Sequence, residues 1–275
     1  MPVLLGVLAS VLIGVSDYYG RFCARRAHAM TSVGTAFIGG LAITSVLLYF
    51  VPSAIDFEAL VLGAGSGALM AFALSAMWHS MAISSAAVAS PIVAAFTALG
   101  PLVYGVGAGE RPSPVVAAGI ALAVVGLLAA VIVPDLAGQL RAGIAFAATA
   151  GAAFAVATVV LAQTSLDSGM WPAVSQRFVA TALMLAATRA LRIPQMLPRT
   201  LRLAGLIGGI IGGAGMAALI AGLQRGPVGA VAVAGSLYPV VTIALAVLFD
   251  DDRLRWWQII GITAVLTGTT LMTIG

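Results

Sequence analysis

The sequence predicts an all-α membrane protein with ten transmembrane helices, arranged as two inverted five-helix repeats. Three observations support this fold class. The chain of 275 residues is 61% hydrophobic and 8% charged, with a mean hydropathy of +1.13, whereas soluble domains carry about 25% charged residues. Its apolar residues form ten long segments, and the two halves share residues at a fixed offset. We therefore expect an integral membrane protein with little mass outside the bilayer.

Ten apolar segments are long enough to cross a bilayer. A transmembrane helix needs about 20 apolar residues to span about 30 Å of hydrocarbon. Charged residues and prolines gather in the short separators between segments. The segments are about twice as long as the strands of a membrane barrel and lack their polar–apolar alternation, so helices are expected. The predicted spans are 3–22, 31–51, 59–80, 86–107, 114–133, 142–163, 171–191, 202–222, 227–249 and 256–274.

The first segment is interpreted as a membrane span rather than as a cleaved signal peptide. Its apolar run covers residues 4–15, and an Ala-His-Ala sequence that weakly resembles a cleavage site follows at 27–29. A signal peptide carries positive charge before its apolar run. Here the positive residues follow the run instead, at Arg21, Arg25 and Arg26.

The two halves of the chain share residues at an offset of 142 positions, and no gap is needed. The same offset places one acid on another, Glu110 on Asp252. We therefore divide the chain into two repeats, residues 1–137 and 138–275. The recurring residues are Gly63, Gly67, Ala76, Arg111, Gly119, Ile120 and Gly126, which correspond to Gly205, Gly209, Ala218, Arg253, Gly261, Ile262 and Gly268.

An odd number of spans in each repeat determines how the halves are related. Because five spans end on the side opposite to their start, the second repeat enters the membrane from the other side. Two such bundles face one cavity and open it to either side at similar energy, which is the basis of alternating access. The recurring glycines of the third and eighth segments are interpreted as packing residues, since small residues let helices approach closely in lipid.

Short motifs in both halves carry a family resemblance. Tyr238-Pro239-Val240-Val241-Thr242 lies in the ninth segment, and Asp251-Asp252-Arg253-Leu254 follows it. Gly109-Glu110-Arg111-Pro112-Ser113 follows the fourth segment, and the seventh contains Trp171-Pro172 and Arg177-Phe178. Together with ten spans and the repeat, they resemble the drug/metabolite transporter superfamily in its ten-helix EamA branch, over essentially the whole chain. Two features depart from the family pattern: three acids at Asp250–Asp252 replace the usual Gly-Glu, and the first half lacks an arginine that matches Arg177.

The resemblance implies a secondary transporter, usually an exporter of small metabolites, amino acids or drugs. We expect a small-molecule substrate, H+ or another coupling ion, and the lipid bilayer as its partners, and a monomer or homodimer. Abundant Ala and Gly and the absence of lysine favour a bacterial origin, and hence the inner membrane. The alternative function is a non-transporting membrane subunit or a channel-like pore.

Other function classes find little support in the sequence. It contains no HExxH motif, no nucleotide-binding loop and no suitably spaced pair of carboxylates. The single cysteine, Cys23, forms neither a disulfide framework nor a cysteine metal site. The arginines stand at the ends of apolar segments, which is typical of headgroup anchoring and not of nucleic-acid binding. We expect no enzyme, no cofactor, no metal and no nucleic-acid partner, and transport that does not use ATP.

Asp17, with Tyr18 beside it, is the first candidate for the substrate or ion pathway. It lies about two-thirds of the way along the first segment, where a charged group is costly and usually faces a cavity or a partner. A structural role is the alternative, because Arg21 follows one helical turn later and can pair with Asp17 at the interface. The sequence leaves both roles open.

Arg177, Gln224 and Tyr238 complete the pathway candidates. Arg177 lies near the start of the seventh segment. The favoured interpretation is that it extends to lipid headgroups, and the alternative is that it holds an anionic group of a substrate. Gln224 and Tyr238 are interpreted as polar lining of a cavity.

Two pairs at segment ends are given structural roles. Trp78 and His79, at the end of the third segment, are interpreted as an anchor at the membrane interface. Ser113 and Pro114 are expected to begin the fifth helix, with Ser113 as its N-cap and Pro114 in its first turn.

Two sequence features indicate opposite orientations in the membrane. Ten spans place both termini on one side. The even-numbered loops hold only Arg111 and Arg225, whereas ten arginines lie at or near the odd-numbered loops, so the positive-inside rule places both termini outside. The family resemblance implies cytoplasmic termini. A reporter fused to one terminus distinguishes the two.

Overall fold

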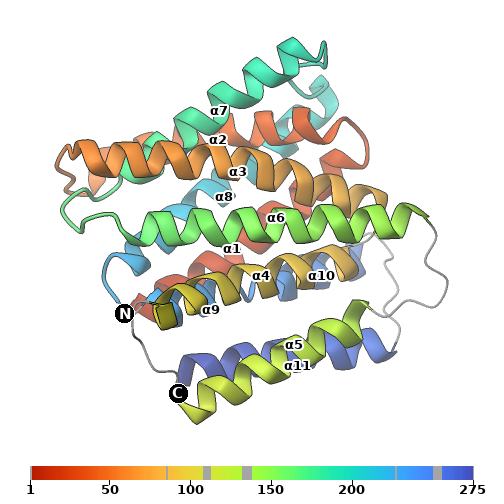
Figure 1. Ribbon diagram of the computed structural model, residues 1–275. Helices are drawn as coiled ribbons and strands as arrows, with labels where there is room; N and C mark the ends of the chain where they lie inside the picture. Colours follow the sequence, from red (N-terminus) through yellow and green to blue (C-terminus); the bar gives the residue numbers. More distant parts are fainter. Residues whose placement is uncertain are drawn as a thin grey trace.

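The structure is a computed structural model that describes residues 2–84, 86–107, 113–131, 138–226, 228–249 and 256–274. All of its regular elements in these ranges are α-helices (Figure 1). They are α1 (Pro2–Ala24), α2 (Ala29–Phe50), α3 (Phe57–Ile83), α4 (Ala86–Gly107), α5 (Pro114–Val131), α6 (Gly138–Ala162), α7 (Trp171–Ala190), α8 (Arg199–Leu223), α9 (Val228–Gly235), α10 (Tyr238–Phe249) and α11 (Trp256–Ile274).

The predicted segments coincide with these helices, except that the ninth consists of two. α9 ends at Gly235 and α10 begins at Tyr238. Pro239 explains the break, because a proline within a helix has no N–H to donate and its ring collides with the carbonyl four residues earlier. That carbonyl belongs to Gly235. The expectation of one continuous ninth helix is therefore wrong.

Five helices within the described residues are long and apolar enough to cross a membrane. These helices cover Pro2–Ala24, Ala29–Phe50, Phe57–Ile83, Arg141–Ala162 and Arg199–Leu223. The protein is thus an all-α, multi-pass membrane protein, and the larger number of ten spans stays a prediction.

The helices of the two halves interleave instead of forming two separate bundles. α1 packs on α8 and on α9 and α10, and α3 packs on α6 and α7. α2 lies against both α7 and α8, while α4 lies against α6. α5 and α11 pack on each other at one side of the molecule (Figure 1). The interior is consequently enclosed by helices from both halves.

Polar side chains cap helices where the sequence provides them. The Ser113 hydroxyl accepts a hydrogen bond from the backbone N–H of Val116 at 3.2 Å, and Pro114 is the first residue of α5. This confirms the expected start of the fifth helix. Asp56 caps α3 in the same way, accepting from the N–H of Glu58 at 3.0 Å. The acidic turn motifs at residues 109–112 and 250–254 lie outside the described residues.

Glycines allow helices of opposite halves to pack with their backbones in contact. A side chain at Gly67 would overlap with the backbone of Gln176 on α7, and one at Gly209 would overlap with the backbone of Ala36 on α2. A side chain at Gly63 would likewise overlap with the backbone of Pro172. Since no side chain fits at these positions, the close helix packing expected at these glycines is confirmed.

Hydrogen bonds connect the two halves of the chain at both ends of α2. Beyond its C-terminus, the N–H of Ala54 donates to the carbonyl of Asp167 in the α6–α7 loop at 2.8 Å. Near its N-terminus, the hydroxyl of Thr31 donates to the carbonyl of Pro194 in the α7–α8 loop at 2.6 Å. Each end of the helical bundle therefore has its own contact between a first-half and a second-half segment.

We expect Gly67→Ala to destabilise the protein and Gly65→Ala to leave its stability unchanged or slightly increased. A Cβ at Gly67 would collide with Gln176, whose Cα lies 3.1 Å from it, whereas a Cβ at Gly65 on the same helix has nothing within 4 Å. Overpacking costs about 1–3 kcal/mol, and replacing a helical Gly by Ala gains about 0.5–1 kcal/mol. Thermal unfolding in detergent measures both variants. Equal melting temperatures would contradict the close approach of α3 and α7.

Candidate functional site

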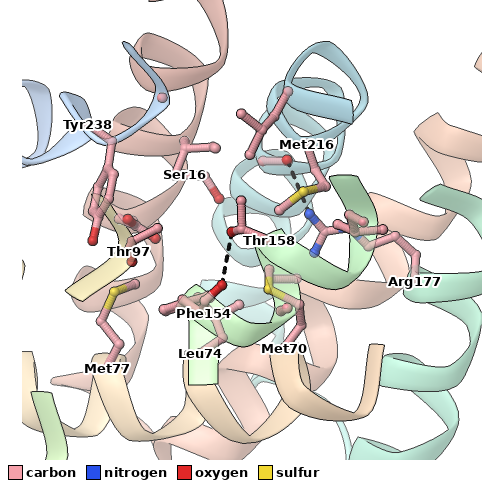
Figure 2. A pocket seen from close by; sticks show the side chains of 18 of the residues that line it. Ser16, Met70, Leu74, Met77, Thr97, Phe154, Thr158, Arg177, Met216 and Tyr238 are labelled. Atoms are coloured by element: carbon pink, nitrogen blue, oxygen red, sulfur yellow. Dashed lines mark hydrogen bonds between the residues drawn. The ribbon is translucent and has the colours of Figure 1, made fainter. Parts of the chain in front are cut away.

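A cavity lies among the helices of both halves (Figure 2). Its empty volume is about 850 Å³, its open part included. Residues of α1, α2, α3 and α4 line it together with residues of α6, α7, α8, α9 and α10. The described residues of α5 and α11 do not line it. The cavity is thus a shared interior site of the two halves.

The lining is mostly apolar, with a few polar groups. Methionine, leucine and phenylalanine side chains form much of its surface, contributed mainly by Met70, Leu74, Met77, Phe154, Met216 and Leu219. The polar side chains are Ser16, Asp17, Thr97, Thr158, Arg177 and Tyr238. One acid and one base therefore face the same apolar space, and three of the five predicted pathway residues are among these polar side chains.

Asp17 is buried and only partly hydrogen-bonded. Its side chain is 2% exposed. Oδ1 accepts a hydrogen bond from the indole Nε1 of Trp78 at 3.2 Å, while Oδ2 has no hydrogen-bond partner among the described residues. No ion pair between Asp17 and Arg21 is found, although both residues are described and buried. The partner of Asp17 is therefore a tryptophan on α3, and one carboxylate oxygen remains available in the cavity.

Trp78 lies in the protein interior and not at the membrane interface. It is 1% exposed. Its ring occupies the place that a side chain at position 20 would take, so Gly20 on α1 makes room for it. The interpretation of Trp78 as an interface anchor is wrong, because its indole donates a hydrogen bond to Asp17 and its ring packs over Gly20 in the protein interior. His79 beside it is exposed, with its ring edge-on to Phe146 at 4.9 Å.

Arg177 is also buried, so the expectation that it extends to headgroups is wrong. The side chain is 6% exposed. Its Nη2 donates to the carbonyl of Gly212 at 3.3 Å, and its guanidinium carbon lies 5.2 Å from the centre of the Phe37 ring. Nε has no hydrogen-bond partner among the described residues. Gly40 leaves room for the arginine, since a Cβ there would lie 3.3 Å from its Cδ.

A buried polar chain fixes α7 beside the cavity. Gln176, which precedes Arg177, is fully buried and donates from Nε2 to the Ser66 hydroxyl on α3 at 2.8 Å. The Ser66 hydroxyl donates in turn to the carbonyl of Ala157 on α6 at 3.3 Å. Because three helices share these bonds, the backbone that carries Arg177 has a defined position.

Tyr238 reaches the cavity from the break between α9 and α10. It is 6% exposed, and its hydroxyl has no hydrogen-bond partner among the described residues. The Thr242 hydroxyl one turn later donates to the carbonyl of Gly14 at 3.1 Å and so holds α10 against α1. The Tyr238 hydroxyl is therefore a further polar atom without a hydrogen-bond partner among the described residues, in the same cavity as Asp17.

The two other predicted residues lie outside the cavity lining. Tyr18 is half-buried, and its ring contacts those of Tyr19 and Phe249, each with centroids 6.0 Å apart. Gln224 caps the end of α8, where its Nε2 donates to the carbonyls of Ser165 and Gly169 at 3.1 and 3.3 Å. Gln224 thus joins α8 to the α6–α7 loop.

Sequence reasoning did not select Ser16, Thr158 or Trp78. The distance from Asp17 to Thr158 along the chain is close to the offset of the repeated residues. An offset of 141, one less than that of the third and eighth segments, places Asp17 on Thr158 and Ala36 on Arg177. All four residues line the cavity. Trp78 has no comparable signal, because its contact with Asp17 joins helices that are distant in sequence.

Comparisons with known proteins give a family and a fold. Residues 141–274 match the sequence model of the EamA-like transporter family. A protein of known crystal structure has 19% sequence identity and a TM-score of 0.72, over 99% of this chain and 96% of that chain. At this identity the likeness shows the fold alone. No curated protein matches the chain.

We expect Trp78→Phe to destabilise the protein, and to do so less when Asp17 is replaced by Asn. The substitution removes the donor to a buried carboxylate, which costs about 1–3 kcal/mol in addition to lost packing. The packing loss is the same in both backgrounds, but a hydrogen bond to a neutral amide is weaker than one to a charged carboxylate. Unfolding free energies of the four proteins measure the difference. Equal costs in the two backgrounds would mean that Trp78 contributes packing only.

Proposed function

Because the chain belongs to the EamA-like transporter family, in the drug/metabolite transporter superfamily, we propose that it is a secondary transporter. It exports small organic solutes, such as metabolites, amino acids or drugs, by alternating access. Residues 1–137 and 138–275 form two inverted repeats of five spans each. The protein acts as a monomer or homodimer in the inner membrane of a bacterium.

The observation that carries this proposal is the pairing of cavity residues across the halves. Seven pairs account for fourteen of the twenty lining residues. If a cavity lies on the pseudo-two-fold axis, equivalent residues of the two repeats line it. This pairing is therefore expected of an inverted repeat. The pairs are Ile13 and Phe154, Ser16 and Ala157, Asp17 and Thr158, and Ala36 and Arg177 at an offset of 141, and Met70 and Gly212, Leu74 and Met216, and Met77 and Leu219 at 142.

Helix packing supports the same relation between the halves. Exchanging the repeats turns α1 into α6, α3 into α8 and α4 into the α9–α10 pair. The contact of α1 with α8 then becomes that of α6 with α3, and the contact of α1 with α9 and α10 becomes that of α6 with α4. Both members of each exchange are observed. The same exchange turns α2 into α7 and α5 into α11. The contacts of α2 with α7 and of α5 with α11 are therefore unchanged by it, as expected for helices beside the pseudo-two-fold axis.

The loop contacts supply candidates for the two gates. The hydrogen bond between Ala54 and Asp167 lies beyond one end of α2, and that between Thr31 and Pro194 lies at the other end. Each bond joins one half to the other. If the halves rock against each other, one contact opens while the other closes, so the cavity faces one side at a time.

The alternative is a channel-like pore or a membrane subunit without transport activity. A pore requires a continuous water-filled path, whereas this cavity combines an apolar lining with a few buried polar groups. In a purely structural subunit, buried polar atoms without hydrogen-bond partners would only be unfavourable. Saturable flux in proteoliposomes supports the transporter, and a non-saturating leak or no flux for any member of a metabolite panel contradicts it.

Asp17 is the candidate site for coupling to an ion gradient. A charged carboxylate inside the membrane is costly, and binding a proton removes that cost. Its second oxygen, Oδ2, has no partner among the described residues and is open to a proton or another cation. Protonation would let the halves close around a neutral side chain. This makes Asp17 the group through which a pH gradient acts.

We predict that Asp17→Asn folds but loses the dependence of flux on the pH gradient. The amide keeps the size and polarity of the side chain and fixes its charge at zero. Flux into proteoliposomes with and without a pH gradient measures the effect, and circular dichroism checks the fold. Unchanged gradient-driven flux in Asp17→Asn would make Asp17 structural and would end the coupling hypothesis.

A further inference from the structure

The cavity contains two opposite charges that do not neutralise each other. Asp17 and Arg177 both line it, and no ion pair joins them although both are described. We infer that the cavity binds a zwitterion, with an anionic group on Arg177, a cationic group on Asp17 and an apolar segment between the two charges. This inference rests on the proposed function and specifies the class of substrate.

Arg177 has the properties of an unoccupied anion site. A guanidinium offers five N–H donors, of which one makes a hydrogen bond of 3.3 Å to a carbonyl and Nε makes none among the described residues. A buried cation without an anion is unfavourable. The planar guanidinium matches the two oxygens of a carboxylate. A ligand carboxylate would neutralise Arg177 and use its remaining donors.

Asp17 and Tyr238 form the complementary cation site. Oδ1 of Asp17 is taken by Trp78, while Oδ2 and the Tyr238 hydroxyl have no hydrogen-bond partner among the described residues. Both side chains line the cavity and are more than nine-tenths buried. An ammonium group has three donors and no acceptor. Two buried acceptors therefore match the ammonium better than they match a neutral or anionic group.

Contacts along α3 place the backbones of the two sites at different levels. α3 meets Gln176, the neighbour of Arg177, at Gly67, and it meets Asp17 at Trp78. Eleven residues of helix separate these backbone levels, a rise of about 16 Å. The side chains of Met70, Leu74 and Met77 line the cavity along this stretch. The Arg177 side chain shortens the gap between the charged groups, because it reaches the carbonyl of Gly212, which lies against Ser16, the neighbour of Asp17.

The close-up agrees with a separation of the two sites. Figure 2 shows Arg177 and Tyr238 on opposite sides of the cavity, with Ser16 and Thr158 between them. A zwitterion whose charges stand at its two ends spans both sites and lays its apolar chain against the methionines. An α-amino acid, whose charges are adjacent, reaches one site at a time.

A matched set of small ligands tests this inference on the purified protein in detergent. The probes are 6-aminohexanoate, its isomer norleucine, 6-aminohexanamide without the carboxylate and hexanoate without the ammonium. Titration calorimetry measures binding. We expect 6-aminohexanoate to bind tightest, and each other probe to bind about tenfold to a hundredfold more weakly, because each lacks one charge-assisted contact.

Variants assign each charged group of the ligand to its residue. Arg177→Gln is expected to abolish the advantage of 6-aminohexanoate over 6-aminohexanamide, and Arg177→Lys to retain part of it. Asp17→Asn is expected to abolish the advantage over hexanoate. Arg189→Gln is the matched control, since Arg189 lies on the same helix at its exposed end, and it should leave all affinities unchanged.

Several outcomes would overturn the inference. Equal affinity of wild type and Arg177→Gln for 6-aminohexanoate removes the anion site, and tighter binding of norleucine removes the separation of charges. Saturable flux of an uncharged solute without binding of any zwitterion refutes this inference and leaves the proposed transporter intact. Binding as expected without flux in proteoliposomes supports the zwitterion site and refutes the transporter.

Discussion

Charged groups inside a membrane protein constrain the rest of this structure. A carboxylate or guanidinium in hydrocarbon is unfavourable unless it faces a partner or a cavity. Asp17 and Arg177 meet this requirement at a single cavity, where Trp78 and the Gly212 carbonyl supply one hydrogen bond each. Outside this cavity, glycines such as Gly63 and Gly67 let the helices pack closely on each other.

In the two-repeat architecture that we propose, the halves share a backbone plan but differ in their charges. Asp17 corresponds to Thr158, and Arg177 corresponds to Ala36. In this proposal, the repeat would supply the symmetric framework that alternating access needs, and the unequal side chains would give the cavity one acidic end and one basic end. In our account, the motion arises from what the halves have in common and the selectivity from the positions at which they differ.

Much of the fold could be predicted from the sequence, because apolar runs of the length of a bilayer leave little choice of structure. The break at Pro239 could not, since α4 continues as one helix through Pro101 and a proline alone does not decide the outcome. Asp17 and Tyr238, which the sequence indicates as pathway candidates, both line the cavity, and their role in transport stays a prediction. Trp78 and Arg177 were assigned to the membrane interface, because a sequence position near a segment end does not reveal which helix a side chain meets. Their burial depends on contacts with α1, α2 and α8, and the local sequence around each residue does not predict such contacts between distant helices.

Alternating access requires that one cavity faces the two sides of the membrane in turn. Thr158→Cys in a Cys23→Ala background places a single thiol in this cavity, and a membrane-impermeant thiol reagent is added to proteoliposomes from either side. If the cavity alternates, the thiol reacts from both sides while the reagent itself does not cross the membrane. Reaction from one side alone, or passage of the reagent through the protein, would contradict alternating access.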